Sequence, residues 1–192
     1  MSREDGRSDG ELAALAAAGD HRAYAVLVSR HKEGLYRFAR RYVGDADAAY
    51  EAAQETFVAA WSALPRYDPV RRPFAVWISA IALNKCRDRA RRATVRRLIF
   101  GDRHLDSPEA AAQSDPSPDA EADLIRTQRL RALDRAIAGL PQNLKEPLLL
   151  TQFEGLSQIE AARMLGLTVK AVETRVRRAR ERLRDDLNKG QV

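Results

Sequence analysis

In the last third of the sequence, residues that favour helix starts alternate with glycines that favour helix ends. This pattern restricts the folds that this part of the chain can adopt. Ser157 and Glu160 can form a capping box before a short helix, and Gly166 can end that helix. Thr168 can cap a longer helix. Its apolar residues recur at helical spacing: Val169, Val172, Val176, Ala179, Leu183 and Leu187. Two helices joined by a glycine-containing turn predict a helix-turn-helix motif.

The second helix of this motif is strongly basic away from its apolar face. Its basic residues are Lys170, Arg175, Arg177, Arg178, Arg180, Arg182 and Arg184. A basic second helix is typical of a recognition helix that lies in the major groove of DNA. An amphipathic surface helix with solvated arginines is the alternative interpretation.

Composition favours an all-α fold. Hydrophobic residues make up 45% of the 192 residues, so the chain can bury cores, while aromatic residues make up only 6%. Ala, Leu, Arg and Glu dominate, and these residues favour helix. No apolar run reaches the roughly 18 residues of a membrane span. The N-terminus is acidic and lacks an apolar signal core, so we expect a cytoplasmic protein without membrane insertion.

Cysteine and histidine usage argues against a metal site. The single cysteine, Cys86, excludes an internal disulfide and fits a reducing compartment. His21, His31 and His104 show no ligand spacing with it. No glycine-rich phosphate loop or nucleophile constellation is present either. We therefore expect no metal, no cofactor, no catalytic residues and no enzymatic activity.

Charge divides the chain into three parts. Residues 1–100 and 124–192 each carry a net charge of +6, while residues 101–123 carry −6. The acidic segment contains three prolines and almost no bulky apolar residues, so we interpret it as a flexible linker. It could reach about 75 Å when extended and about 27 Å as a coil. The sequence thus predicts two small helical domains, 1–100 and 124–192, joined by the linker 101–123.

Helical periodicity and breakers locate the elements within these domains. In the first, we expect helices at about 9–18, 22–42, 46–64 and 74–92, with a loop between Pro65 and Pro73. In the second, we expect helices at about 124–140 and 144–153 before the helix-turn-helix. Pro147 is tolerable only near the start of its helix, where few amide donors have helical partners.

Several motifs occur in an order that resembles a known family, the extracytoplasmic-function sigma factors of bacterial RNA polymerase. The stretch EAAQETFVAAW, Glu51 to Trp61, resembles their Gln-Glu-aliphatic-Phe motif, and WISAIALNKCRDRARR, Trp77 to Arg92, resembles their WLYRIARN segment and the basic helix after it. Leu-Pro at 140–141, EGLS at 154–157, EAA at 160–162, LG at 165–166 and RAR at 178–180 follow in the same order.

The sequence departs from the family pattern at a few positions. Tyr50 stands where a second acid is common, and Ala52 replaces a leucine. Ala161 replaces a usual isoleucine in the helix-turn-helix, and Pro147 stands where an aliphatic residue is common. The linker is longer than in many members.

The resemblance implies that the helix 46–64 binds the polymerase core, by packing against a coiled coil on the largest catalytic subunit. The residues expected to make this contact are Gln54, Glu55, Val58 and Trp61. Phe57 and Trp61 also fit a purely structural role in the core.

The resemblance further implies that the segment Trp77 to Arg92 captures the non-template strand of the −10 element. Single-stranded bases are held by stacking, by polar contacts to exposed base edges and by basic residues along the backbone. The expected −10 residues are Trp77, Asn84, Lys85, Arg87, Asp88, Arg89, Arg91 and Arg92. A solvated basic helix is the alternative. Cys86 would be reactive only if its basic neighbours lowered its pKa.

By the same resemblance, the recognition helix reads the −35 element as duplex DNA. The expected contacts come from Lys170, Glu173, Thr174, Arg175, Arg177 and Arg178. Arginine can pair bidentately with guanine, and glutamate can accept from cytosine. The acidic linker would thread toward the active-site cleft and RNA exit path of the polymerase.

The expected partners are therefore the RNA polymerase core, promoter DNA and an anti-sigma factor that covers the same surfaces. A stand-alone helix-turn-helix regulator that binds an operator is the alternative function. Such a regulator would bind duplex DNA by itself at nanomolar affinity, whereas a sigma factor would need core polymerase.

Overall fold

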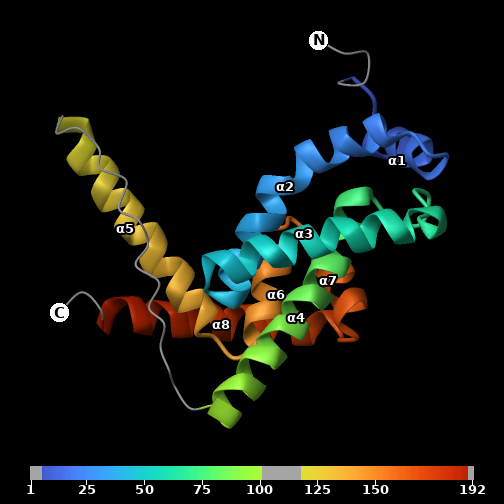
Figure 1. Ribbon diagram of the computed structural model, residues 1–192. Coiled ribbons are helices and arrows are strands. Elements are labelled where there is room, and N and C mark those ends of the chain that lie inside the picture. The colour runs from blue at the N-terminus through green and yellow to red at the C-terminus, as the bar shows by residue number, and fades with distance from the viewer. Residues whose placement is uncertain (1–5, 101–117, 190–192) are drawn as a thin grey trace.

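The computed structural model describes residues 6–100 and 118–189, and no strand occurs among them (Figure 1). The expected all-α fold with two helical units is therefore confirmed. The N-terminal unit consists of α1 (Asp9–Ala17), α2 (His21–Val43), α3 (Ala46–Ala63), the short 3-10 turn η1 (Leu64–Arg66) and α4 (Phe74–Phe100). The C-terminal unit consists of α5 (Pro118–Ala138), α6 (Gln142–Gln152), α7 (Gln158–Leu165) and α8 (Val169–Lys189).

Side-chain caps explain where the N-terminal helices begin and end. Ser8 and Glu11 form a complete capping box on α1, in which the Glu11 carboxylate accepts from the Ser8 amide at 2.7 Å. Asp20 and Asp45 accept from the first free amides of α2 and α3. Gly44 ends α2 with a φ of 82°, a left-handed conformation that glycine adopts without strain.

Small residues on α3 allow the helices of the N-terminal unit to pack closely. Its buried side chains are mostly alanines, among them Ala49, Ala52 and Ala60. Larger residues from α2 and α4 fill the space around them, including Phe38, Phe74 and Ile78. Figure 1 shows α2 and α3 running side by side, with α4 crossing below them.

The helix-turn-helix is present at the predicted position. Ser157 and Glu160 form a second complete capping box at the start of α7. Gly166, with a φ of 66°, ends α7. The hydroxyl of Thr168 then accepts from the Ala171 amide at 3.1 Å at the start of α8.

The largest differences from the predicted helix boundaries are at the end of α4 and at the start of α5. Helix α4 continues to Phe100, eight residues past the expected end at Arg92, because no proline or glycine interrupts the basic segment. Helix α5 begins at Pro118, inside the segment predicted as linker, while residues 101–117 of that segment lie outside the described residues.

Pro147 is the sixth residue of α6, later than its chemistry favours. It leaves the carbonyl of Asn143 without the helical amide donor that another residue would supply. Its own carbonyl accepts from the Thr151 hydroxyl at 2.8 Å.

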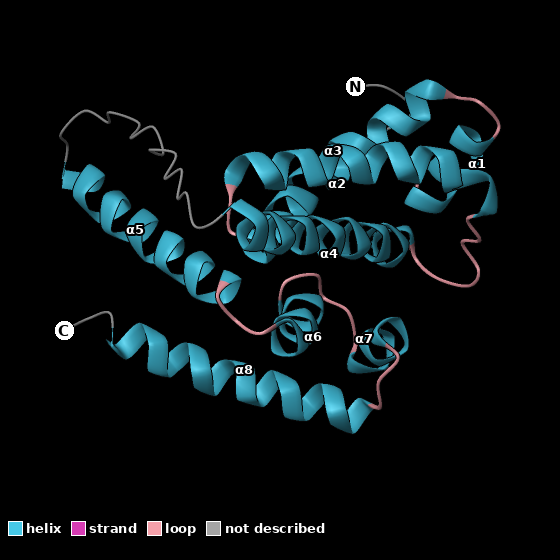
Figure 2. Ribbon diagram, turned by 60° about the horizontal axis from the view of Figure 1, so that its bottom comes forward, coloured by secondary structure: helices cyan, strands magenta, loops and turns pink. Residues whose placement is uncertain are grey.

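The two units contact each other through the end of α2, which lies against α5 and α6. Figure 2 shows α6 between the N-terminal helices and α8. Helix α5 also contacts α8, from which it rises at a steep angle in Figure 1. Within the two described ranges, none of the helices is both long and apolar enough to cross a membrane.

Candidate functional site

An open groove of about 530 Å³ lies between α3 and α4 and contains three of the four residues predicted to bind polymerase. Gln54, Glu55 and Val58 line it from α3, and Lys85 and Arg89 line it from α4. Val58 is 69% exposed, so its apolar side chain is available to a partner seated in the groove. The groove thus combines an apolar contact with charges of both signs.

Arg89 joins the two sides of this groove. Its guanidinium forms ion pairs with Glu51 and Glu55, both at 2.5 Å. Burial by itself would lower the pKa of Arg89, but the hydrogen bonds to these two carboxylates raise it. The guanidinium is only 17% exposed. Arg89 therefore fixes α4 against α3 and is not exposed to solvent as Arg91 and Arg92 are.

Trp61 lies on the other side of α3, against α2. Its ring stacks on His21 with 4.9 Å between ring centroids and meets the ring of Tyr24 at 4.8 Å. The Tyr24 hydroxyl donates to the carbonyl of Phe57 at 2.5 Å, and burial raises the pKa of Tyr24 to about 12. Trp61 is half-buried, so it supports α3 and leaves only part of its ring accessible.

Four of the predicted −10 residues share an exposed polar face of α4. Asn84, Arg91 and Arg92 are exposed, and Asp88 is half-buried beside them. Asp88 accepts from Arg91 at 2.8 Å. This face combines amide, carboxylate and guanidinium groups, which are the groups that can contact base edges and phosphates of a single strand.

The other four predicted −10 residues are directed elsewhere. Trp77 is 5% exposed and packs against Tyr67 and Phe74, with ring centroids 4.9 and 5.5 Å away. Lys85 and Arg89 face the groove beside α3. Arg87 turns toward α6 of the C-terminal unit. The structure thus places the eight residues on different sides of α4.

Helix α8 buries its apolar face and exposes most of its basic one. Val172, Val176, Ala179 and Leu183 are buried. Of the predicted −35 residues, Lys170 pairs with Glu173 at 3.5 Å and Arg177 pairs with Glu181 at 2.9 Å, both in exposed positions. Arg178 is exposed, while Thr174 and Arg175 are half-buried. Four of the six predicted −35 residues, Lys170, Glu173, Arg177 and Arg178, are therefore exposed on α8.

A buried polar cluster between the units was not anticipated from the sequence. The Glu146 carboxylate on α6 accepts from Arg87 at 2.7 and 2.5 Å, from the Tyr42 hydroxyl at 2.8 Å and from Gln142 at 2.8 Å. Burial would raise the pKa of Glu146, but these hydrogen bonds hold it below its usual value. The only advance signal is the Lys145–Glu146 pair inside the otherwise apolar stretch around Leu144–Leu150.

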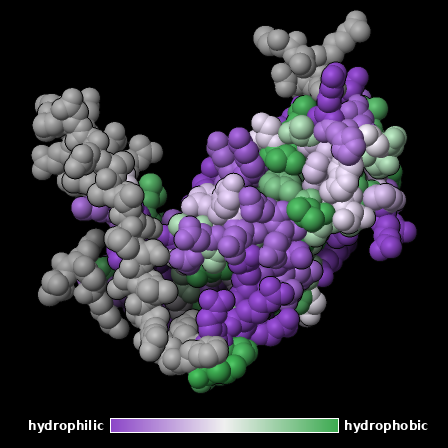
Figure 3. Space-filling view, viewed as in Figure 1, coloured by the Kyte–Doolittle hydropathy of each residue, from purple (hydrophilic) through white to green (hydrophobic). Residues whose placement is uncertain are grey.

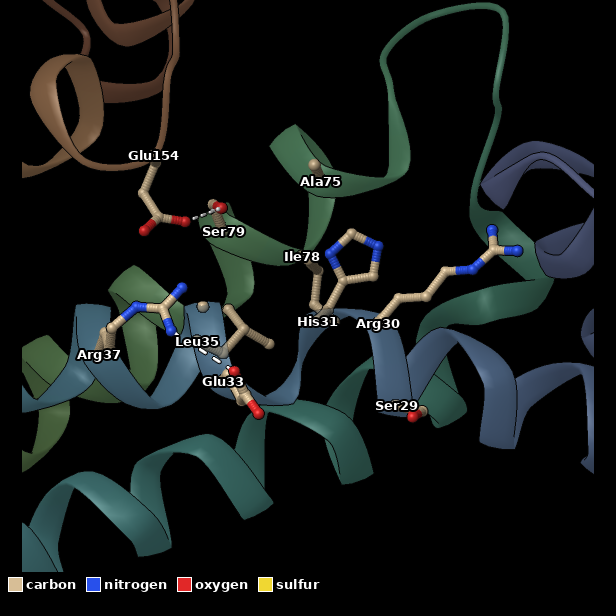
Figure 4. A pocket seen from close by; sticks show the side chains of 11 residues that line it. Ser29, Arg30, His31, Glu33, Leu35, Arg37, Ala75, Ile78, Ser79 and Glu154 are labelled. Carbon is tan, nitrogen blue, oxygen red and sulfur yellow. Dashed lines mark hydrogen bonds and ion pairs between the residues drawn. The ribbon is translucent and has the colours of Figure 1, made fainter. Parts of the chain in front are cut away.

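A second polar contact between the units borders a cavity of about 300 Å³ (Figure 4). Figure 4 shows Glu154 directed at Ser79 of α4, and the Ser79 hydroxyl donates to this carboxylate at 3.1 Å. Burial raises the pKa of Glu154. His31 and Arg37 of α2 lie across the cavity.

Cys86 is fully buried, and burial raises the pKa of its thiol to about 12. A thiol with a raised pKa is a poor nucleophile at neutral pH. Among the described residues, no group of three or more His, Cys, Asp or Glu side chains is placed to hold a metal ion.

The surface view shows a mainly hydrophilic face, with a hydrophobic patch at the lower end of the described chain (Figure 3). In Figure 1 the C-terminal end of α4 lies there. Val95, Leu98 and Ile99 of this end are exposed.

Comparison with known proteins places both units in one family. The chain matches sigma-70 region 2 over residues 27–96 and sigma-70 region 4 over residues 130–183. It is 41% identical over 186 residues to the RNA polymerase sigma factor CnrH of Cupriavidus metallidurans, covering 95% of each chain. It is 34% identical to the ECF RNA polymerase sigma factor SigC of Mycobacterium tuberculosis, covering 91% of this chain and 89% of that one.

A solved structure agrees with this assignment. The structure of CnrH in complex with the cytosolic domain of CnrY matches with a TM-score of 0.67 and 36% identity, covering 95% of this chain and 99% of that chain. The fold and both regions therefore agree, and the chain belongs to the extracytoplasmic-function sigma factors of bacterial RNA polymerase.

Proposed function

We propose that this sigma factor docks on core RNA polymerase through the groove between α3 and α4, and reads promoter DNA with α4 and α8. Gln54, Glu55 and Val58 make the polymerase contact, with Trp61 supporting α3 from behind. The chain directs initiation by binding alone and performs no chemistry of its own, as a transcription initiation factor acting in the cytoplasm.

The observation that carries this proposal is the position of the groove next to the polar face of α4. Arg89 fixes the two helices to each other through Glu51 and Glu55. A polymerase surface seated in the groove therefore determines where the exposed side chains of α4 lie. Asn84 and Asp88 would contact an unpaired base of the −10 element, while Arg91 and Arg92 would hold its phosphates.

Trp77, Lys85, Arg87 and Arg89 take different parts in this scheme. Trp77 anchors the start of α4 through its packing on Tyr67 and Phe74. Lys85 and Arg89 belong to the polymerase groove. Arg87 reaches a phosphate only when it is released from Glu146.

For the −35 element, α8 enters the major groove. Glu173, Thr174, Arg177 and Arg178 contact base edges, and Lys170 and Arg175 hold phosphates. Because α7 and α8 are joined at Gly166 and capped at Thr168, the recognition helix is held at a defined angle to its support.

The solved CnrH chain is bound to the cytosolic domain of CnrY. We infer that this chain likewise has a protein inhibitor, an anti-sigma factor, that covers its polymerase and DNA surfaces.

Run-off transcription with purified core polymerase tests the proposal, with sequencing of the transcript starts. We expect specific starts only when the chain and core are combined. Val58→Glu should abolish stable holoenzyme in size-exclusion chromatography, because the new charge must be buried in the groove. Val70→Glu is the matched control, since Val70 is exposed in a loop away from the groove. Equal core affinity for both variants would contradict the groove assignment. Nanomolar operator binding by the free chain would favour the stand-alone regulator.

A further inference from the structure

The contact between the two units uses a residue that the proposed function assigns to DNA. Arg87 donates two hydrogen bonds to Glu146, from Nε at 2.7 Å and from a terminal nitrogen at 2.5 Å. This is the bidentate geometry by which a guanidinium also binds a phosphate. Glu146 therefore occupies the position that a phosphate oxygen pair would take on Arg87.

The surroundings of Glu146 are complete without any external ligand. The Tyr42 hydroxyl and the Gln142 amide also donate to its carboxylate, both at 2.8 Å. Glu146 is only 5% exposed. A buried carboxylate is stable only when it is fully hydrogen-bonded, so separating the units exchanges three of these donors, two from Arg87 and one from Tyr42, for water at once, while Gln142 stays with Glu146 on α6.

Further contacts hold the same two surfaces together. The Lys145 ammonium donates to the carbonyl of Tyr42 at 3.0 Å, across the boundary. Arg41 of α2 pairs with Asp134 of α5 at 3.0 Å, and its guanidinium lies 4.3 Å from the ring centroid of Phe153. We call this contact between the two units the seam; it extends over α2, α4, α5 and α6 and is made by specific polar pairs.

Promoter binding and this seam are geometrically incompatible. Elements at −10 and −35 are separated by about 25 base pairs, which is about 85 Å along the duplex at 3.4 Å per base pair. In the structure, α4 contacts α6 directly through Arg87 and Glu146, and α6 packs on α8. The units must come apart before α4 and α8 can reach their separate elements.

We propose that Glu146 acts as an internal mimic of DNA phosphate, which closes the free chain by holding Arg87 and keeps α4 from binding the −10 strand until the units separate. The inference rests on the proposed −10 role of α4. It adds a layer of control that the chain carries in its own α6, independent of any inhibitor.

Distance measurements on the free, full-length chain test closure. Dyes on cysteines introduced by Val70→Cys and Asp185→Cys would report the separation of the units by single-molecule energy transfer. Cys86 is fully buried and would not compete for label. We expect the wild-type chain to be mainly closed, and Glu146→Gln to raise the ratio of open to closed molecules roughly tenfold or more, because charged hydrogen bonds are lost. Asp47→Asn removes the same charge from an exposed position on α3 and should leave the ratio unchanged.

The affinity of the free chain for a single-stranded −10 oligonucleotide is a second measurement. It should not change if Glu146 merely stabilises the fold. Glu146→Gln should bind it about tenfold more tightly than the wild type. Arg87→Gln should open the chain equally but show a smaller gain, because the phosphate contact is lost as well. If Glu146→Gln proves unfolded by circular dichroism, Tyr42→Phe removes one donor to Glu146 without changing charge and should shift the ratio in the same direction by a smaller factor.

Two results would overturn the inference: an open wild-type chain, or an unchanged ratio in the folded variants. Either could occur while wild-type holoenzyme transcribes normally, which would leave the proposed function intact. Conversely, a wild-type chain that closes as expected but does not support transcription with core would refute the function and not the closure.

Discussion

Arg89 on α4 and Glu55 on α3 are 2.5 Å apart across the groove proposed to receive the polymerase. Glu51 binds the other terminal nitrogen of the same guanidinium. Removing the Arg89 side chain would therefore leave two carboxylates near each other without a cation. We expect Arg89→Ala to lower the free energy of unfolding by about 1.5–3 kcal/mol in urea denaturation. Arg92→Ala, at an exposed position of the same helix, should stay within about 0.5 kcal/mol. Equal effects of both would contradict the bridging role of Arg89.

Arg178 is exposed on the outer side of α8, at a position expected to contact a base edge. Arg178→Ala should weaken promoter binding by holoenzyme by about 1–3 kcal/mol and relax specificity at one position of the −35 element. A gel shift of the holoenzyme on promoters with substitutions in that element measures both. Arg163→Ala, on α7, serves as the control for loss of one positive charge. Unchanged affinity and sequence preference for Arg178→Ala would reject the assignment.

Gly44 ends α2 in a left-handed conformation at the seam between the units. An added Cβ would lie 3.0 Å from the Cβ of Ala138, and the φ of 82° disfavours any other L-residue. Gly44→Ala should therefore destabilise the chain by about 1–3 kcal/mol. Gly34→Ala, inside α2 with no heavy atom within 4 Å of the new Cβ, should instead stabilise it by about 0.5–1 kcal/mol. Thermal unfolding followed by circular dichroism separates the two signs.

The Glu146 carboxylate makes the stability of the seam depend on pH. Its folded pKa lies below its usual value of 4.5, so its contribution is present above that value and is lost as the pH falls through the lowered folded pKa. Glu154 has a raised pKa, so its contribution has the opposite sign and is lost as the pH rises through its folded pKa. Tyr42 and Lys145 also face Glu146, and burial raises the pKa of Tyr42 and lowers the pKa of Lys145.

We therefore expect the free energy of unfolding to fall below pH 4.5 in the wild type and to fall less steeply in Glu146→Gln. Urea denaturation at a series of acidic pH values measures this slope. Glu154→Gln should remove the decrease in the free energy of unfolding that Glu154 causes as the pH rises above 4.5. Parallel curves for wild type and Glu146→Gln would contradict the assigned role of the carboxylate.

Cys86 should be inert in the folded chain, because its thiol is buried and its pKa is raised to about 12. Iodoacetamide should label it only after denaturation, as followed by mass spectrometry. Rapid labelling of the native chain would show that the segment around Cys86 opens.

Local sequence signals predicted the helices well because their causes are local. The capping boxes Ser8–Glu11 and Ser157–Glu160 and the glycines at 44 and 166 act within a few residues, so each could be located without the fold. The same holds for the apolar face of α8, whose buried residues follow the predicted periodicity.

The directions in which the polar side chains of α4 point could not be predicted from the sequence. Eight residues of α4 were expected to face DNA, but Arg89 is engaged by α3, Arg87 by α6 and Trp77 by the core. Which arginine is paired depends on helices that are distant in the chain. The assignment of individual contacts to polymerase and promoter stays a prediction.

Lys145 joins the ends of two helices from different units. Its ammonium donates to Ala138 at the end of α5 at 2.5 Å and to Tyr42 near the end of α2 at 3.0 Å. Helix C-termini carry partial negative charge, so one cation neutralises both. Lys145 and Ala138 both belong to the C-terminal unit, so their hydrogen bond would persist if the two units separated. The Tyr42 carbonyl in the N-terminal unit would then bind water instead. Separation of the units would thus be asymmetric, because the C-terminal unit keeps the cation while the N-terminal unit exposes a carbonyl to water.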